Sequence, residues 1–369
     1  MALLADGLCI NETYEVEAFL GEGAFAEVYR VKHRFLGRQA MKFFKAPGWS
    51  PDEVSAMLGE AVLLSKINHP NIVRVYDANT ASLMGDTFGF FTMEYIAGGS
   101  LSQYWRSFGA QFMPVKDVVE VMRQVCKGIA VAHSHNPPII HRDIKPQNIL
   151  IGHETNGIRA RVSDFGLAKN VNPLTLMATS RGTVSFKAPE ALQDIQGDSL
   201  SGDVWALGTT LYLLLTDRLP YEIEDGLSHG TADTFSNPPP PPSRWNALCD
   251  SELDQVVLKG LKVDPKERYG SAMEFLTALE AWRPDTKRTD RAKSGSGSPG
   301  NTSKGVLGTT PQAREHLGRQ LALRSIAIAQ DPARLSEAVR LMEKALNESP
   351  ELNREYEARL RLWRRGISM

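Results

Sequence analysis

The chain has 369 residues, of which 42% are hydrophobic and 23% are charged, so it can bury a substantial core and is long enough for more than one domain. Its formal net charge of −1 argues against a nucleic-acid partner, and its 3 widely spaced cysteines argue against a disulfide framework or a zinc site and suit a reducing cytoplasm. No apolar run approaches the roughly 18 residues of a membrane span, and residues 1–6 lack the basic and apolar regions of a signal peptide. We therefore expect a cytoplasmic protein without a transmembrane segment.

Charge is divided unevenly along the chain. Residues 284–369 contain 16 Lys or Arg and 10 Asp or Glu, a balance of +6, which leaves −7 for residues 1–283. A basic tail beside an acidic domain can bind anionic partners, but a solvated surface is the more ordinary explanation.

The first third of the chain is predicted to be rich in strands. Residues 14–40 alternate apolar and polar side chains around a glycine-rich run, Gly21-Glu22-Gly23. Because this run stands between two predicted strands and does not open a helix, it fits neither a dinucleotide-binding fingerprint nor a Walker loop. Taken alone, a glycine turn between strands is also typical of any hairpin.

A helix is predicted to begin at Ser50, because serine at the N-cap, proline at the first helical position and glutamate at the third form a capping box. Glu60 shares the apolar side of this helix with residues such as Met57 and Leu64. A carboxylate on a buried face is costly without a partner. Lys42, at the end of the preceding strand, is the obvious partner, and a solvated strand lysine is the alternative.

Further strands are predicted up to Tyr95, and after Ser100 the pattern becomes mostly helical, most clearly over residues 118–133 and 204–215. A strand-rich first part followed by a helical second part predicts an α+β architecture of two lobes with a cleft between them. Residues 284–311, rich in Ser, Gly, Thr and Lys, predict a flexible linker.

Helical patterning resumes over residues 312–369, which predicts a small all-α segment at the end of the chain. Residues 338–345, followed by Pro350, resemble the second helix of a tetratricopeptide repeat. Only one half-repeat fits, and one unit cannot bury its own apolar face. A generic helical hairpin explains the pattern equally well.

Two loops carry the side chains that say most about chemistry. One reads His141-Arg142-Asp143-Ile144-Lys145-Pro146-Gln147-Asn148, and the other begins Asp164-Phe165-Gly166. Phosphoryl transfer needs an oriented hydroxyl, positive charge near the phosphates and bound magnesium, but little covalent chemistry from the protein. Here Asp143 can accept a proton, Lys145 can bind a phosphate, and Asn148 with Asp164 offers the oxygen ligands that magnesium prefers.

These motifs, in their order and spacing with the glycine-rich run, Lys42, Glu60 and the sequence Ala188-Pro189-Glu190, resemble those of eukaryotic-like (Hanks-type) serine/threonine protein kinases. The resemblance covers about residues 14–283 and is closer to bacterial than to animal members. It implies a two-lobed protein kinase fold, with a small β-rich N-lobe at 14–96, a larger helical C-lobe at 97–283 and an N-terminal extension at 1–13. It also implies ATP and Mg²⁺, with Mn²⁺ as a possible substitute, and protein substrates phosphorylated on Ser or Thr.

The resemblance assigns roles to individual residues. Asp143 would be the catalytic base, Lys145 and Lys42 would contact phosphates, Glu60 would orient Lys42, and Asn148 and Asp164 would hold the metal. The nucleotide is expected to contact ten residues, Leu20, Gly21, Gly23, Val28, Ala40, Lys42, Met93, Glu94, Ile96 and Leu150. The family pattern further implies a structural ion pair between Glu190 and Arg268, and an Asp203 that anchors the backbone of residues 141–143.

Two features favour serine and threonine over tyrosine as the acceptor. Lys145 follows Asp143 by two positions, and Gly182-Thr183 precedes residues 188–190 as in Ser/Thr kinases. The segment from Leu167 to Lys187, which ends at residues 188–190, resembles the activation loop of these kinases. Arg142, directly before Asp143, carries a positive charge that a phosphate in this loop would meet.

We therefore predict activation by phosphorylation of Thr175, Thr179 or Ser180, with constitutive activity as the alternative. Two other function classes stay open. One is a pseudokinase used as a scaffold, against which the intact catalytic residues argue. The other is an interaction protein in which residues 312–369 bind a substrate, a regulator or a second copy of the chain.

Overall fold

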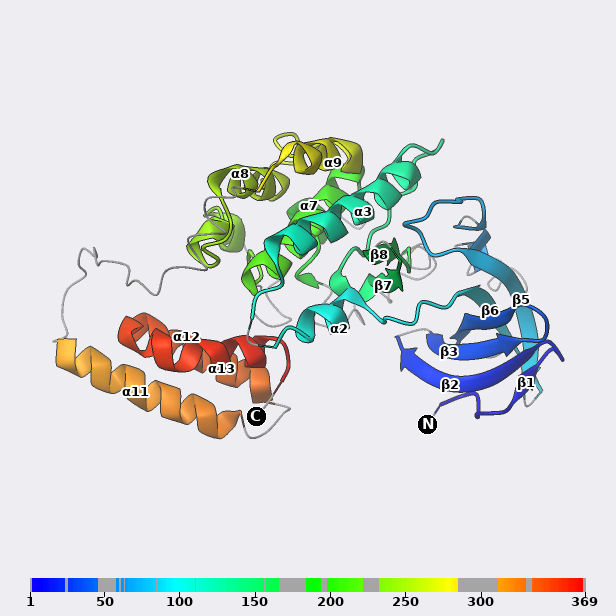
Figure 1. Ribbon diagram of the computed structural model, residues 1–369, viewed down its shortest axis with the longest axis horizontal. Coiled ribbons are helices and arrows are strands. Elements are labelled where there is room, and N and C mark those ends of the chain that lie inside the picture. The colour runs from blue at the N-terminus through cyan, green and yellow to red at the C-terminus, as the bar shows by residue number, and fades with distance from the viewer. Residues whose placement is uncertain are drawn as a thin grey trace.

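The structure is a computed structural model that describes residues 2–23, 26–45, 58–59, 61–62, 64–83, 85–109, 111–155, 157–165, 184–193, 198–221, 232–284, 311–329 and 334–367. It contains a strand-rich lobe, a helical lobe and a separate group of helices at the C-terminal end (Figure 1). The predicted two-lobed α+β architecture is confirmed.

The N-lobe is built on one antiparallel sheet of six strands in the order β1-β2-β3-β4-β6-β5. Its strands are β1 (Cys9–Ile10), β2 (Tyr14–Glu22), β3 (Ala26–His33), β4 (Gly37–Phe44), β5 (Val75–Leu83) and β6 (Asp86–Glu94). The strands predicted between Tyr14 and Ala40 are therefore present, and the glycine-rich run lies between β2 and β3.

Side-chain alternation gives this sheet two different faces. Tyr29, Met41 and Phe90 point into an N-lobe cluster that also takes up Leu4 from the N-terminal segment. Ala40 and Met93, paired across β4 and β6, belong instead to the main core, which continues into the C-lobe. The second face therefore presents β3, β4 and β6 to the rest of the molecule.

The N-terminal residues are fastened to the first face. The backbone N–H of Leu3 donates to Oε2 of Glu27 at 2.8 Å, and that of Leu4 donates to the Tyr29 hydroxyl at 3.0 Å. The Tyr29 hydroxyl in turn donates to Glu27. A buried carboxylate on a strand thus receives the two donors that its burial requires.

The helix expected from Ser50 is described only in part, at residues 58–59, 61–62 and 64–65, which are helical. Ala61 and Leu64 are buried in the main core, as the predicted apolar stripe requires. Glu60 lies outside the described residues.

The C-lobe combines helices with a two-stranded hairpin. Its elements are α2 (Leu101–Arg106), α3 (Val115–His133), β7 (Ile149–Glu154), β8 (Gly157–Val162), α6 (Pro189–Gln193), α7 (Leu200–Thr216), α8 (Ser251–Gly260) and α9 (Ala272–Ala281). Short 3-10 turns accompany them, at η1 (Pro146–Asn148), η3 (Ala232–Phe235) and η4 (Pro242–Arg244). The β7–β8 hairpin interrupts the mostly helical pattern expected after Ser100. The sequence did not indicate it, because its alternating run is too short to stand out from a helical background.

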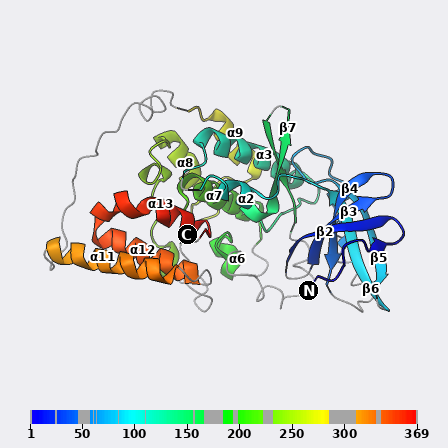
Figure 2. The ribbon, with the colours of Figure 1, turned by 60° about the horizontal axis from the view of Figure 1, so that its bottom comes forward.

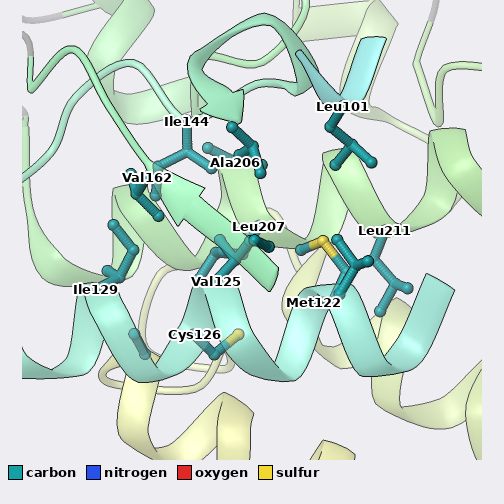
Figure 3. Close-up of a cluster of buried hydrophobic side chains, with 14 of the residues drawn as sticks. Leu101, Met122, Val125, Cys126, Ile129, Ile144, Val162, Ala206, Leu207 and Leu211 are labelled. Atoms are coloured by element: carbon teal, nitrogen blue, oxygen red, sulfur yellow. The ribbon is translucent and has the colours of Figure 1, made fainter. Parts of the chain in front are cut away.

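The C-lobe core forms where α3 and α7 face each other (Figure 3). Met122, Val125 and Ile129 of the amphipathic α3 meet Leu207 and Leu211 of α7. Helix α7 is apolar on all sides and is buried along almost its whole length, as expected for a central helix. Its first turn and its C-terminal end therefore hold their polar residues inside the protein.

The C-terminal unit, residues 311–367, consists of α11 (Pro311–Ile328), α12 (Leu335–Glu348), the turn η6 (Pro350–Leu352) and α13 (Asn353–Arg364). Helices α11 and α12 run side by side in both views (Figures 1 and 2). The unit has its own apolar core, which includes Ala338, Met342 and Trp363. Its likeness to a tetratricopeptide repeat stays a prediction, and most of the predicted linker lies outside the described residues. Among the residues described, no helix is both long and apolar enough to cross a membrane.

Candidate active site

The loop between α3 and β7 gathers two polar side chains around the carboxylate of Asp143. Oδ2 of Asp143 lies 3.1 Å from Nζ of Lys145 and accepts a hydrogen bond of 3.0 Å from Nδ2 of Asn148. The same Nδ2 donates to the backbone carbonyl of Asp143 at 2.8 Å. The turn η1 brings Asn148 back toward Asp143, so the expected proton acceptor, phosphate lysine and metal ligand lie together.

Lys42 reaches this group from the other lobe. Its Nζ lies 2.7 Å from Oδ1 of Asp164, and it stands 5.6 Å from the ring centroid of Phe91. Burial alone would raise the pKa of the Asp164 carboxyl, but the charge and hydrogen bond of Lys42 outweigh it, so the pKa lies below its usual range. Asp164 is therefore an anion at neutral pH, held where a cation can reach it.

Asp203, in the first turn of α7, holds the backbone of the Asp143 loop. Its Oδ2 accepts from the N–H of His141 at 2.7 Å, and its Oδ1 accepts from the N–H of Arg142 at 2.9 Å. Arg142 has a φ of 70° and Asp164 has a φ of 55°, a left-handed backbone conformation that residues other than glycine rarely adopt. The predicted anchoring role of Asp203 is confirmed, and it stabilises a strained backbone immediately before Asp143.

Two histidines complete this framework, and their contacts define their tautomers. Nδ1 of His133 accepts from the Ala272 N–H at 3.2 Å, so its Nε2 carries the proton that points to Asp203 at 3.0 Å. Nδ1 of His141 accepts from the Asp143 N–H at 3.2 Å, and its Nε2 donates to the Ser163 carbonyl at 3.0 Å. Burial lowers the pKa of His141, which keeps the imidazole neutral.

The residues expected around a nucleotide share one side of the N-lobe sheet. Val28 on β3 pairs with Lys42 on β4, and Ala40 pairs with Met93 on β6, which places these side chains on the face turned toward the C-lobe. Ala40 and Met93 are part of the main apolar core, and Val28 and Leu150 pack against it. Leu20 is 44% exposed at the end of β2, next to Gly21 and Gly23.

The segment that joins the lobes begins at Glu94, the last residue of β6, and continues through Ile96. The Glu94 carboxylate lies 3.3 Å from Nε of Arg161 on β8, an ion pair that the sequence did not suggest. Two residues after Ile96, a Cβ on Gly98 would meet the Ile151 carbonyl oxygen at 2.1 Å. Only glycine permits this close approach, which packs the connecting segment against β7.

Arg142 meets a carboxylate rather than open solvent. Its Nε lies 3.4 Å from Oδ2 of Asp198, whose Oδ1 is 3.1 Å from Nζ of Lys187. A short distance away, the predicted pair of Glu190 and Arg268 is confirmed as a two-bond contact of 2.6 and 2.7 Å. Lys187 and Glu190 are therefore each held in the C-lobe by an ion pair.

The comparisons with known proteins agree with this geometry. The family model of the protein kinase domain matches residues 14–279.

The chain belongs to the protein kinase family.

Among its curated relatives are bacterial Ser/Thr kinases. PrkC of Bacillus subtilis is 32% identical, with 76% of this chain and 43% of that protein aligned. PknB of Mycobacterium tuberculosis is 34% identical, with 73% of this chain and 43% of that protein aligned, and pkn3 of Myxococcus xanthus is 32% identical over 78% and 53% respectively. The chain thus spans about half or less of the length of these relatives. A crystal structure of the PknI kinase domain of Mycobacterium tuberculosis superposes with a TM-score of 0.56 at 26% identity, covering 75% of this chain and 98% of that domain.

Several expected kinase residues lie outside the part of the chain that the structure describes. They are Glu60, Gly166, Thr175, Thr179, Ser180, Gly182 and Thr183. The contact expected between Lys42 and Glu60 therefore remains a prediction. Conversely, sequence reasoning missed His133, Arg161 and Asp198. Nothing in the local pattern of the first two indicates their partners, Asp203 and Glu94, which lie 70 and 67 residues away along the chain, and Asp198 follows no recognisable motif. A histidine on the buried side of α3 was the one signal available for His133.

The side chains present fit a magnesium ion shared with phosphates. In the described residues, no group of three or more His, Cys, Asp or Glu side chains could hold a metal by itself. Magnesium, however, is commonly bound by one or two protein oxygens, with phosphate oxygens and waters completing its shell. Asp164 offers a carboxylate, and Asn148 uses its NH₂ group on Asp143, which leaves its amide oxygen for a cation.

Proposed function

We propose that the chain is a protein-serine/threonine kinase that transfers the γ-phosphate of ATP to Ser or Thr hydroxyls of protein substrates. The observation that carries this proposal is the convergence of Asp143, Lys145 and Asn148 from one loop with Lys42 and Asp164 from two others. Membership of the kinase family and relatives that are named Ser/Thr kinases support it.

Asp143 is the base in this proposal. It accepts the proton of the acceptor hydroxyl while the hydroxyl oxygen bonds to the γ-phosphorus, and the bond from that phosphorus to the β,γ-bridging oxygen breaks to leave ADP. Lys145, 3.1 Å from the Asp143 carboxylate, is close enough to place its charge beside the transferred phosphoryl group. The hydrogen bond from Asn148 holds the carboxylate in position, so the base does not have to be ordered during the reaction.

Lys42 binds the other phosphates in this proposal, and Asp164 and Asn148 hold magnesium, or manganese in its place. The metal, when bound, neutralises charge that develops on the phosphate oxygens. Lys42 at present contacts Asp164 at 2.7 Å, so the two charges stay paired until phosphates separate them. The adenine is proposed to lie against Val28, Ala40 and Leu150, near the backbone of Glu94 and Ile96.

We also propose that Arg142 is the sensor of activation-loop phosphorylation at Thr175, Thr179 or Ser180. Asp198 supports this idea because it shows that a carboxylate is accepted beside Arg142. A phosphate carries more charge than a carboxylate and offers three strong acceptor oxygens. It would therefore compete with Asp198 for the guanidinium.

The direct test is transfer of labelled γ-phosphate from ATP with magnesium, with sites mapped by mass spectrometry. Native protein is expected to label Ser or Thr, and Asp143→Asn should lose at least about a hundredfold in rate, because a general base contributes about 10²–10⁴. Asp254→Asn is the matched control, since it makes the same change at a buried carboxylate that instead accepts from the Ser243 N–H. Equal labelling by native protein and Asp143→Asn would refute the proposal.

A second candidate function is a protein-binding scaffold in which the C-terminal unit recruits a substrate, a regulator or another copy. The well-formed apolar core of that unit favours it. Native protein that binds ATP, detected as a thermal shift, yet labels neither itself nor a generic basic protein would support this candidate. For either function we place the protein in the cytoplasm, in keeping with its widely spaced cysteines.

A further inference from the structure

The C-terminal unit contacts the C-lobe through a fully buried arginine. Arg365, just after α13, has no exposed side-chain surface, and its Nη2 lies 2.7 Å from Oδ1 of Asp217, which is equally buried. Nε1 of Trp105, on α2, donates to the same oxygen at 2.8 Å. The guanidinium also donates to the backbone carbonyl oxygens of Gly109 and Gln111. One side chain of the C-terminal unit thus joins α2, the loop after it and the end of α7.

The position of Asp217 explains why an arginine is needed there. Asp217 is the C-cap of α7, where the helix dipole makes a negative charge unfavourable. It is removed from water, and its Oδ2 has no hydrogen-bond donor among the residues described. A buried charge without a partner is strongly destabilising, so the nearby cation is essential. In the described structure that cation comes from 148 residues further along the chain.

Contacts around this buried pair extend the same interface. The guanidinium of Arg361, one turn before Arg365 on α13, lies 3.8 Å from the ring centroid of Phe112. Glu343 of α12 lies 2.5 Å from Arg364 in its own unit and 3.6 Å from Arg218 of the C-lobe. These contacts involve both α12 and α13, so the unit meets the C-lobe along a surface and not at one point.

The far end of α7 carries the other critical aspartate. Asp203 lies in the first turn of α7 and holds the backbone of the Asp143 loop, and Asp217 caps the last turn. The same helix thus connects the C-terminal unit with the candidate active site. A loss of order at the Asp217 end is expected to weaken the packing of the helix on which Asp203 depends.

From these contacts we propose that the C-terminal unit is a brace of the kinase domain, docked in cis on the surface formed by Trp105, Gly109, Gln111, Phe112, Asp217 and Arg218. Its occupant is the chain's own α12–α13 pair, and Arg365 is the residue that secures it. The docked face is consequently closed to other proteins, and a recruited partner has to bind elsewhere on the unit. This proposal stands whether or not the chain transfers phosphate.

A double-mutant cycle in the full-length chain tests the docking. Asp217→Asn keeps a residue that tolerates the left-handed φ of 57°, and Arg365→Met keeps most of the side-chain length. Each change alone should lower the melting temperature by about 5 °C or more. The double variant should be no less stable than the less stable of the two single variants. The coupling between the two residues should then be at least about tenfold in the unfolding equilibrium constant. Arg324→Met, at an exposed arginine of α11, is the control and should change little.

Additive losses from Asp217→Asn and Arg365→Met, or an Arg365→Met protein as stable as Arg324→Met, would overturn the proposal. Hydrogen exchange in the same proteins gives a second reading that does not depend on global unfolding. Amides of residues 106–109 and 111–113 should exchange at least about tenfold faster in Arg365→Met than in Arg324→Met. Equal exchange in the two variants would mean that the unit does not cover this surface.

Discussion

Replacing Asp203 by asparagine should cost both stability and phosphoryl transfer. The carboxylate is 2% exposed and receives three donors, with His133 and His141 on Oδ2 and Arg142 on Oδ1. An asparagine has one acceptor oxygen and one NH₂ group. Whichever way the amide is turned, at least one of the three donors then faces another donor.

The size of the loss follows from these contacts. One buried N–H without an acceptor costs about 1–3 kcal/mol, and the bonds that remain lose about 1 kcal/mol each because their acceptor is no longer charged. The total is about 3–5 kcal/mol, close to the usual cost of breaking a buried charged network. For a domain of this size, each kcal/mol lowers the melting temperature by roughly 2–4 °C.

Urea unfolding and steady-state kinetics together test this reasoning. Asp203→Asn should lower the free energy of unfolding by the amount given above and should lower kcat more than it raises KM for ATP, because the Asp143 loop and not the nucleotide pocket loses its anchor. Asp254→Asn, which loses charge at a carboxylate with one backbone donor, should lose about 1 kcal/mol and keep its kinetics. An Asp203→Asn protein with native kcat at a temperature where it is fully folded would show that Asp203 does not position the loop.

Three further outcomes are expected. Arg268→Lys should lose roughly 3 kcal/mol of unfolding free energy in urea, because a lysine cannot reproduce the two bonds to Glu190 together with the donation to the Ser201 carbonyl. Lys262→Met, at an exposed ion pair, is the control and should lose less than about 1 kcal/mol. Similar losses in the two variants would contradict the assigned role of the buried guanidinium. The free energy of unfolding should fall as the pH drops below about 6.5, because the unfolded chain then takes up a proton that buried His141, with its lowered pKa, does not bind. The slope of this free energy against pH should flatten in His141→Gln but not in His153→Gln. His69, whose pKa burial also lowers, accounts for a residual slope. Of the three cysteines, exposed Cys9 should be alkylated in the native protein. Buried Cys126, whose pKa burial raises, and buried Cys249 should react only after unfolding. If mass spectrometry finds all three modified at the same rate, the described packing is contradicted.

Much of the candidate site can be predicted from the sequence because its side chains lie close together along the chain. Asp143, Lys145 and Asn148 lie within six consecutive positions, and one short turn is enough to bring them together. The glycine-rich run at residues 21–23 likewise could be assigned to a turn between two strands from the local sequence, without knowledge of any tertiary contact. The pairing of Glu190 with Arg268 was also predicted, but only through the resemblance to kinases, since no local rule joins two residues so far apart.

The long-range ion pairs were decided by the tertiary structure alone. Lys42 with Asp164, Arg142 with Asp198, and Arg365 with Asp217 each depend on where separate elements pack, and a charged residue in a sequence looks the same whether it is solvated or buried. Helical periodicity predicted that residues 312–369 form helices, because periodicity records which face of a helix is apolar. It could not predict that Arg365 would be buried against α7, because the partner surface is assembled from α2, its following loop and the end of α7 only after the C-lobe has folded.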